Sequence, residues 1–223
     1  VMFFMQPRED VAVVRSEGFA GVAITVCAVG TIALGLFPSP VLSTQSGGCA
    51  SPVSAVIDLH VPDLEARILP GLEAVEDRLH RSVSDSRDLV TELTSHLAQA
   101  GGKRMRPLLT LVAAQFGDPQ RALSDEVLTA ATGIELTHLA SLYHDDVMDS
   151  APTRRGVPSA QHLWGNNRAI LAGDILFARA SAMIATLGDE TVRHHAVTFE
   201  RLCMGQLNET FGPEEGDDPL TFY

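Results

Sequence analysis

The sequence has few cysteines and few basic residues. Its three cysteines, Cys27, Cys49 and Cys203, show neither disulfide spacing nor the paired spacing of a metal site. Lysine and arginine total 16 against 28 aspartate and glutamate residues, so the formal net charge is −12, and no basic stripe appears. The negative balance argues against a nucleic-acid partner, and the scattered cysteines favour a reducing compartment.

Charge is missing altogether from one long stretch near the N-terminus. Residues 18–57 contain no Asp, Glu, Lys or Arg, and residues 19–37 form an uninterrupted run of 19 mostly apolar residues. A membrane-spanning helix needs about 20 such residues. The run therefore predicts a membrane anchor, with a buried or processed segment as the alternative. Residues 43–57, rich in Ser, Pro and Gly, predict a flexible linker after an N-terminal segment of residues 1–42.

From residue 58 to the end the composition is that of a globular domain, and the pattern is helical. No alternating strand pattern or internal repeat competes with it. Apolar spacing and capping residues predict helices at 62–82, 88–100, 107–116, 125–148, 167–187 and 190–211. The predicted fold class of residues 58–223 is therefore all-α.

Three carboxylates gather at the end of the helix predicted at 125–148. Asp145 and Asp149 are four residues apart, which on a helix places their Cβ atoms about 5–6 Å from each other, with Asp146 beside them. Carboxylates that close repel one another unless a cation lies between them, and Mg²⁺ suits such oxygen ligands. The alternative is a solvated acidic helix end. The mostly apolar run at 136–143 favours a buried helix and so the metal site.

Basic residues lie on both sides of this motif. Arg154 and Arg155 follow it, and guanidinium groups bind phosphate oxygens bidentately. Lys103 and Arg106 precede it at the start of a predicted helix, where free N–H groups already favour anions. An exposed arginine pair is ordinary by itself, but its short distance in sequence from the carboxylates favours a shared polyanion.

His138 lies seven residues before Asp145 and therefore near the same helix face, two turns lower. A core histidine with a satisfied hydrogen bond is the ordinary explanation for such a residue. Its alignment with the carboxylates makes a binding role an equal alternative.

Taken in order, these residues form a set of five motifs. They are Gly102-Lys103-Arg104-Met105-Arg106-Pro107, Glu135-Leu136-Thr137-His138, Asp145-Asp146-Val147-Met148-Asp149 with Arg154-Arg155-Gly156, Gly173-Asp174-Ile175-Leu176, and Gly205-Gln206. The set resembles the N-terminal half of trans-polyprenyl diphosphate synthases, which elongate an allylic diphosphate with isopentenyl diphosphate. The resemblance covers residues from about 60 to 223.

The resemblance implies a role for each matching residue. It implies that Asp145 and Asp149 ligate Mg²⁺ on the allylic diphosphate, with Asp146 in the same catalytic cluster and Arg154 on that diphosphate. It further implies that isopentenyl diphosphate is bound by Lys103, Arg106, His138 and Arg155, and that Gln206 lines the allylic pocket. The implied fold is the isoprenoid synthase helical bundle, usually a homodimer, with the synthase part in the cytoplasm.

Two small residues below the carboxylates bear on product length. Ala140 and Ser141 precede Asp145 by five and four residues. Short-chain members of the family tend to carry aromatic residues in this region. The small pair therefore favours a medium or long polyprenyl product, and the alternative is that Ala140 merely suits helix packing.

Two parts of the chain depart from the family pattern. Residues 1–42 are foreign to it, and they faintly resemble the last helix of subunit N of bacterial NADH-quinone oxidoreductase. The family's second aspartate-rich motif is missing, since Asp217-Asp218 is followed by Pro219. We therefore expect an incomplete bundle that by itself turns over no substrate. A non-catalytic diphosphate-binding partner subunit, or a membrane or respiratory-complex fragment fused to a synthase fragment, remain the alternatives.

Overall fold

The computed structural model describes residues 60–84 and 87–213, and helices dominate this part of the chain. Their bounds are α2 Pro62–Val83, α3 Asp88–Gln99, α4 Met105–Ala114, α5 Asp125–Met148, α6 Ala160–Trp164, α7 Asn166–Ala185 and α8 Asp189–Phe211. The prediction of an all-α fold is confirmed.

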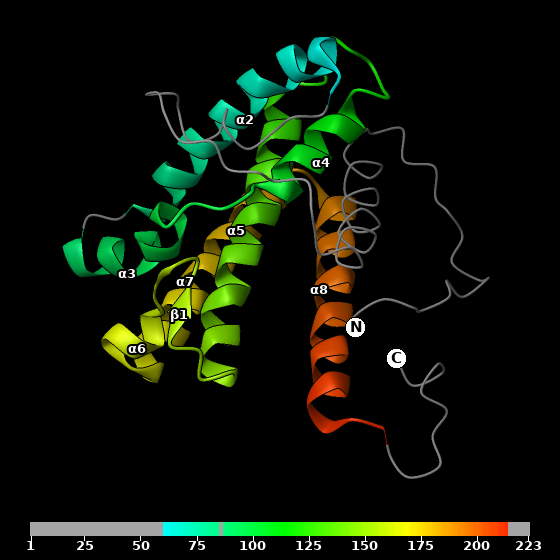
Figure 1. The fold of residues 1–223 in the computed structure, drawn as a ribbon. Coiled ribbons are helices and arrows are strands. Elements are labelled where there is room, and N and C mark those ends of the chain that lie inside the picture. The colour runs from blue at the N-terminus through cyan, green and yellow to red at the C-terminus, as the bar shows by residue number, and fades with distance from the viewer. Residues whose placement is uncertain (1–59, 85–86, 214–223) are drawn as a thin grey trace.

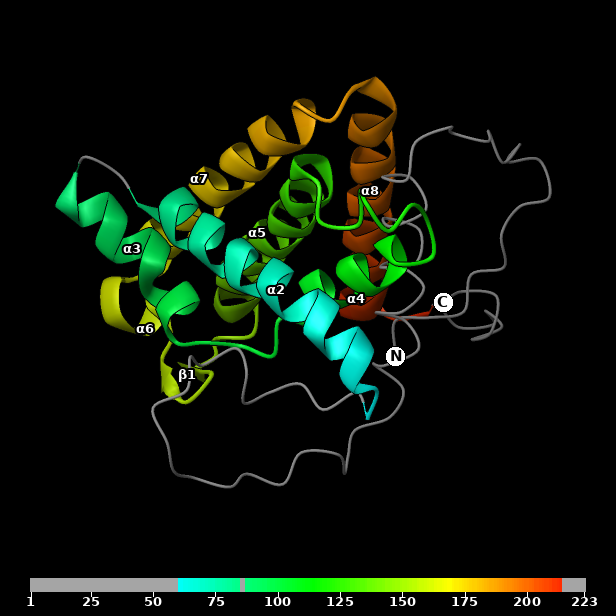
Figure 2. The same ribbon diagram turned by 90° about the horizontal axis from the view of Figure 1, so that it is seen from above.

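Helix α5 runs through the middle of the bundle (Figure 1). Its buried residues are distributed around the whole helix, and the consecutive residues 127–133 are all buried, as expected of a helix enclosed by neighbours. It packs most extensively on α7, then on α4 and α2, and α2 crosses over it when the molecule is seen from above (Figure 2). The motif residues at 135–149 thus lie on a helix whose position is fixed from several sides.

Helix α3 is fastened to α5 by one buried aromatic residue. The Tyr143 hydroxyl donates a hydrogen bond to the carbonyl oxygen of Leu93 at 2.5 Å and accepts one from the amide of Leu97 at 3.3 Å. Burial raises the pKa of Tyr143 to about 12, so the phenol stays a donor. This contact holds the end of α3 against the helix that carries the carboxylates. It thereby also places the start of the loop at 100–104, which contains Lys103 and Arg104.

Three local predictions need correction. Strands β1 Thr153–Arg154 and β2 Val157–Pro158 pair as an antiparallel hairpin where no strand was expected. The short helix α6 follows the hairpin and was also missed. Helix α4 begins at Met105 and ends at Ala114, two residues earlier than predicted at each end. The earlier start follows from Arg104, which adopts a left-handed conformation and acts as the N-cap.

The predicted anchor at residues 19–37, the linker at 43–57 and the residues Asp217-Asp218 lie outside the described residues. Among residues 60–84 and 87–213, no helix is long and apolar enough to cross a membrane.

Candidate functional site

The acidic cluster occupies the last turn of α5. Asp149 is the C-cap, and its amide donates a hydrogen bond to the carbonyl oxygen of Asp145 at 2.8 Å. Asp145 is half-buried and Asp149 is exposed. The two carboxylates therefore lie one helical turn apart, as the spacing predicts.

Asp146 has a different environment from the other two carboxylates. It is fully buried, and its Oδ1 accepts a hydrogen bond from Nε of Arg154 at 2.6 Å and forms an ion pair with Nη2 of the same guanidinium, also at 2.6 Å. Its Oδ2 is also buried and has no hydrogen-bond partner among the described residues. Asp146 thus holds the guanidinium of Arg154 beside Asp145 and Asp149.

Burial and mutual repulsion work against ionisation in this cluster. Burial, aided by the charges of Asp149 and Asp146, raises the pKa of Asp145 although Arg154 opposes the shift. Burial likewise raises the pKa of Asp146, against the hydrogen bond and charge of Arg154. A divalent cation would relieve both effects.

The donor set suits Mg²⁺, which typically takes one or two protein carboxylates and fills its shell with water and phosphate oxygens. In the part of the chain that the structure describes, no three acidic, histidine or cysteine side chains converge on one point.

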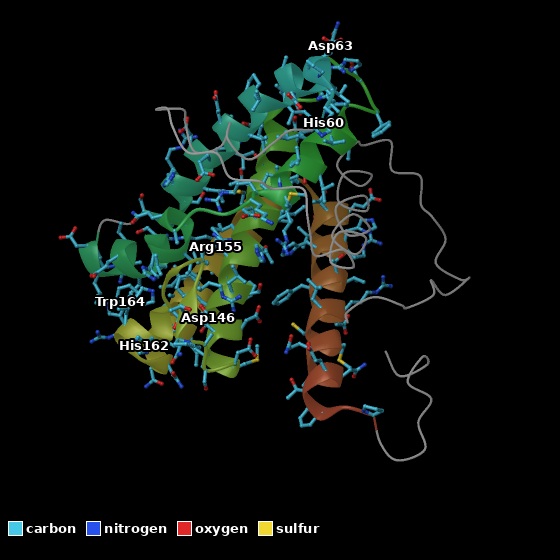
Figure 3. The ribbon with its side chains drawn as sticks, viewed as in Figure 1. His60, Asp63, Asp146, Arg155, His162 and Trp164 are labelled. Carbon is cyan, nitrogen blue, oxygen red and sulfur yellow. The ribbon has the colours of Figure 1, made fainter. Side chains whose placement is uncertain are left out.

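The hairpin after α5 positions Arg155. Its two-residue turn consists of Arg155 and Gly156, with φ values of 53° and 79°, as a type I′ turn requires. The Arg155 guanidinium donates hydrogen bonds to the carbonyl oxygen of Leu97 at 2.9 Å and to that of Gly101. These carbonyls lie in and just after the last turn of α3, where cations are favoured. Figure 3 shows Arg155 and Asp146 at different heights beside α5.

A second, cationic cluster forms around His138. Burial and the charges of Arg106, Arg155, Arg104 and Arg154 lower the pKa of His138 to about 2, so its ring is neutral. The ring can therefore donate one hydrogen bond without adding charge. Three of the four residues predicted for isopentenyl diphosphate, His138, Arg106 and Arg155, lie near enough for the two guanidinium charges to act on His138 and on each other. Lys103 is exposed on the loop before α4.

Three further residues, to which the sequence patterns assign no role, build this cluster. The Arg104 guanidinium is buried and binds Glu76 of α2 and Glu135 of α5. Glu135 begins the motif Glu135-Leu136-Thr137-His138, and a glutamate within a largely apolar helix indicates a buried carboxylate that needs a cationic partner. Glu76 lies 28 residues from Arg104, and no local pattern connects the two.

The remaining predicted residues lie elsewhere on α5 and α8. Ala140 has no exposed surface and packs near Gly173 of α7, whereas Ser141 is half-buried and donates a hydrogen bond to the carbonyl oxygen of His138 at 2.9 Å. Gln206 is half-buried on α8, and within the described ranges its side chain makes no hydrogen bond to either cluster.

The Gly173-Asp174 motif forms the packing contact below the carboxylates. A Cβ atom on Gly173 would overlap the imidazole of His144 and lie 3.2 Å from the carbonyl oxygen of Ala140, so a larger residue there would displace the His144 side chain. Nε2 of His144 lies 3.1 Å from the carbonyl oxygen of Ile170 and 3.4 Å from Oδ1 of Asp174. This contact fixes α5 next to Asp145.

The architecture is that of the isoprenoid synthase bundle. The crystal structure of a geranylgeranyl pyrophosphate synthase from Corynebacterium glutamicum, complexed with calcium and isoprenyl diphosphate, matches 75% of this chain and 50% of its own, at 46% identity and a TM-score of 0.65. A heptaprenyl diphosphate synthase from Staphylococcus aureus matches 65% of this chain and 44% of its own, at 30% identity and a TM-score of 0.58.

A family pattern described as polyprenyl synthetase matches residues 87–222, and the chain belongs to that family. A nonaprenyl diphosphate synthase of Mycobacterium tuberculosis is 45% identical over 77% of this chain and 50% of its own length. Component 2 of a heptaprenyl diphosphate synthase from Geobacillus stearothermophilus is 41% identical over 68% of this chain and 47% of its own. The chain thus spans about half the length of the curated relatives it matches.

Proposed function

We propose that this chain forms the substrate-binding end of a cytoplasmic prenyltransferase that condenses isopentenyl diphosphate with an allylic diphosphate. The observation that carries the proposal is the arrangement along α5. Two carboxylates one turn apart, with Arg154 beside them, lie at the end of a helix that carries a cationic cluster two turns lower. One site fits a diphosphate bridged by Mg²⁺, and the other fits a diphosphate bound directly.

The chemistry requires both sites. Cleavage of the allylic carbon–oxygen bond leaves charge on the departing diphosphate, which Arg154 beside Asp145 and Asp149 is placed to stabilise. Mg²⁺ held by Asp145 and Asp149 would supply further positive charge to the same leaving group. Arg106, Arg155 and His138 would anchor isopentenyl diphosphate so that its double bond meets the allylic carbon before water does.

Binding of inorganic pyrophosphate tests this proposal directly, and it suits a chain that spans about half the length of its relatives. We expect calorimetry to show binding that Mg²⁺ strengthens. Asp145→Asn and Asp149→Asn should each reduce that strengthening by at least about tenfold, because each removes one of two metal ligands. Asp77→Asn, on the exposed face of α2, is the matched control and should leave it unchanged. Pyrophosphate binding that ignores Mg²⁺ and both variants would contradict the proposal.

We further propose a medium or long product. Among the relatives are synthases named for nonaprenyl and heptaprenyl products. Replacing Ser141 by Phe in a complete synthase that carries this α5 should shorten the product. Ser141 is a cleaner test than Ala140→Tyr, because Ala140 has no exposed surface and a larger side chain there must displace neighbouring core residues. Unchanged product length with both variants would remove this part of the proposal.

A homodimer is the assembly we propose. Leu171 on α7 and Leu202 and Leu207 on α8 are exposed apolar side chains that a second subunit could cover. The relative named component 2 favours a second candidate, a pair of unlike subunits in which this chain binds diphosphate without turnover. Sedimentation of the purified chain tests the first, because a dimer needs no other protein.

The anchor at residues 19–37 stays a prediction, as does the resemblance of residues 1–42 to the oxidoreductase subunit. Membrane fractionation that deletion of residues 1–57 abolishes would support the anchor.

A further inference from the structure

Arg104 carries a role that neither its spacing nor the relatives assign. We propose that Arg104 is a positioning residue which, through Glu76 of α2, holds the start of α4 so that Arg106 faces His138 and Arg155. This inference rests on the proposed function for its ligand, a diphosphate group. Arg104 itself does not touch the ligand.

One guanidinium joins three helices at this point. Nε and Nη2 of Arg104 donate hydrogen bonds to the two carboxylate oxygens of Glu76 at 2.7 and 2.8 Å, the bidentate geometry that arginine favours. Nη2 also donates to the carbonyl oxygen of Ala98 at 3.1 Å, and Nη1 to Oε1 of Glu135 at 3.3 Å. Contacts with α2, α3 and α5 therefore fix the residue from which α4 starts.

The backbone of Arg104 turns its side chain inward. Its φ and ψ are 45° and 36°, a left-handed conformation that is strained for a residue other than glycine. This conformation separates three neighbouring cations, because Arg104 is buried while Lys103 stays exposed and Arg106 half-exposed. The contacts with Glu76 and Glu135 offset the backbone strain and keep the Arg104 side chain buried.

The charge of Glu76 supports the same division. Burial opposes ionisation of Glu76, but the hydrogen bonds and charge of Arg104, with His80 and Arg155, outweigh it and lower the pKa of Glu76. Glu76 is therefore a carboxylate that neutralises Arg104, so that Arg104 does not compete for an anion. Glu76 also lies before residue 87, where the family pattern begins.

Calorimetry with inorganic pyrophosphate, in chelator and in Mg²⁺, tests the inference on the full chain. Glu76→Gln and Arg104→Lys should each weaken Mg²⁺-free binding about tenfold, the effect of misplacing roughly one charged hydrogen bond. The further gain on adding Mg²⁺ should change less than about twofold, because it depends on Asp145 and Asp149. The double variant should lose little more than either single variant, since both changes break one contact.

The control is Arg78→Met. Arg78 links α2 to α5 through Asp125 at 2.6 Å and Thr129 at 3.1 Å, away from the cationic cluster. It should lower thermal stability and leave Mg²⁺-free affinity unchanged. If the Glu76→Gln and Arg104→Lys variants bind pyrophosphate as tightly as the unaltered chain, the positioning role is wrong. It is also wrong if all three variants, Arg78→Met included, lose affinity in proportion to their loss of stability.

Failure of the proposed function would look different. An unaltered chain that binds pyrophosphate only with Mg²⁺ would overturn direct binding at the cationic cluster, and with it the positioning role, but would leave the Mg²⁺-dependent site standing. A chain that binds it under neither condition would overturn the proposed function as well.

Discussion

The two charged clusters on α5 are built in opposite ways. In the cationic cluster, Arg104 is paired with Glu76 and Glu135, and Arg155 is fastened to carbonyls of α3. In the acidic cluster only Asp146 has a partner, whereas the side chains of Asp145 and Asp149 make no hydrogen bond or ion pair within the described residues. The first cluster is assembled by the fold before any ligand arrives. The second leaves its charge balance to a cation and a ligand.

The largest effect that would test this contrast is on stability. Arg104→Met should lower the free energy of unfolding by about 3–5 kcal/mol, because it leaves the buried Glu135 and the half-buried Glu76 without their partner. Arg154→Met strands only Asp146, whose raised pKa lets it take up a proton, and should cost about 1–3 kcal/mol. Urea denaturation at neutral pH measures both. Equal losses would mean that the acidic cluster is held as firmly as the cationic one.

A smaller effect is the pH dependence of the free energy of unfolding, to which Glu76 and Glu135 contribute with opposite signs. The pKa of Glu76 is lowered, so its pairing stabilises the fold fully above the ordinary value of 4.5 and is lost as the pH falls through the lowered pKa. Burial raises the pKa of Glu135 despite Arg104, Arg106 and Arg155, so its contribution grows as the pH falls through that raised pKa toward 4.5.

Urea titrations of single variants separate the two terms. Glu76→Gln should cost about 1–2 kcal/mol at pH 7, and the difference from the unaltered chain should shrink at pH 3.5. Glu135→Gln should instead remove a gain in stability on mild acidification. The same pH profile for both variants would contradict the assigned charges.

The smallest effect should come from the exposed end of the acidic cluster. Asp149→Asn removes a carboxylate from the negative end of the α5 dipole, so the free energy of unfolding should rise by no more than about 0.5 kcal/mol. The same variant should lose Mg²⁺-dependent pyrophosphate affinity. A large loss of stability in chelator would show that Asp149 supports the fold rather than a ligand.

Much of the fold follows from local signals. The glycine pair at 101–102, Pro107 and Gly188 mark helix ends close to where α3, α4 and α7 end or begin. The hairpin was missed because its strands are two residues long, and Pro152, Gly156 and Pro158 resemble an ordinary loop. Strand pairing that short leaves no period to detect.

The sequence predicts which residues form the site but not which of their side chains point into the protein. The spacing of Asp145 and Asp149 depends only on helix geometry, and it is found as expected. Arg104 is the one of three neighbouring cations that turns inward, because its backbone is left-handed. That conformation is typical of glycine or asparagine, so an arginine at this position does not predict it. The pairing of Asp146 with Arg154 depends in turn on the hairpin.

The placement of the carboxylates at the end of α5 has a practical consequence. The final turn closes with the Asp149 amide on the Asp145 carbonyl, at the pole of the helix where anions are least welcome. Amide hydrogen exchange in that turn should be fast in EDTA and slow in millimolar magnesium, while α2 and α4 exchange alike in both. In preparations kept in chelating buffers the end of α5 would then be frayed. Ligand affinities measured on them would be lower than those of the protein in magnesium.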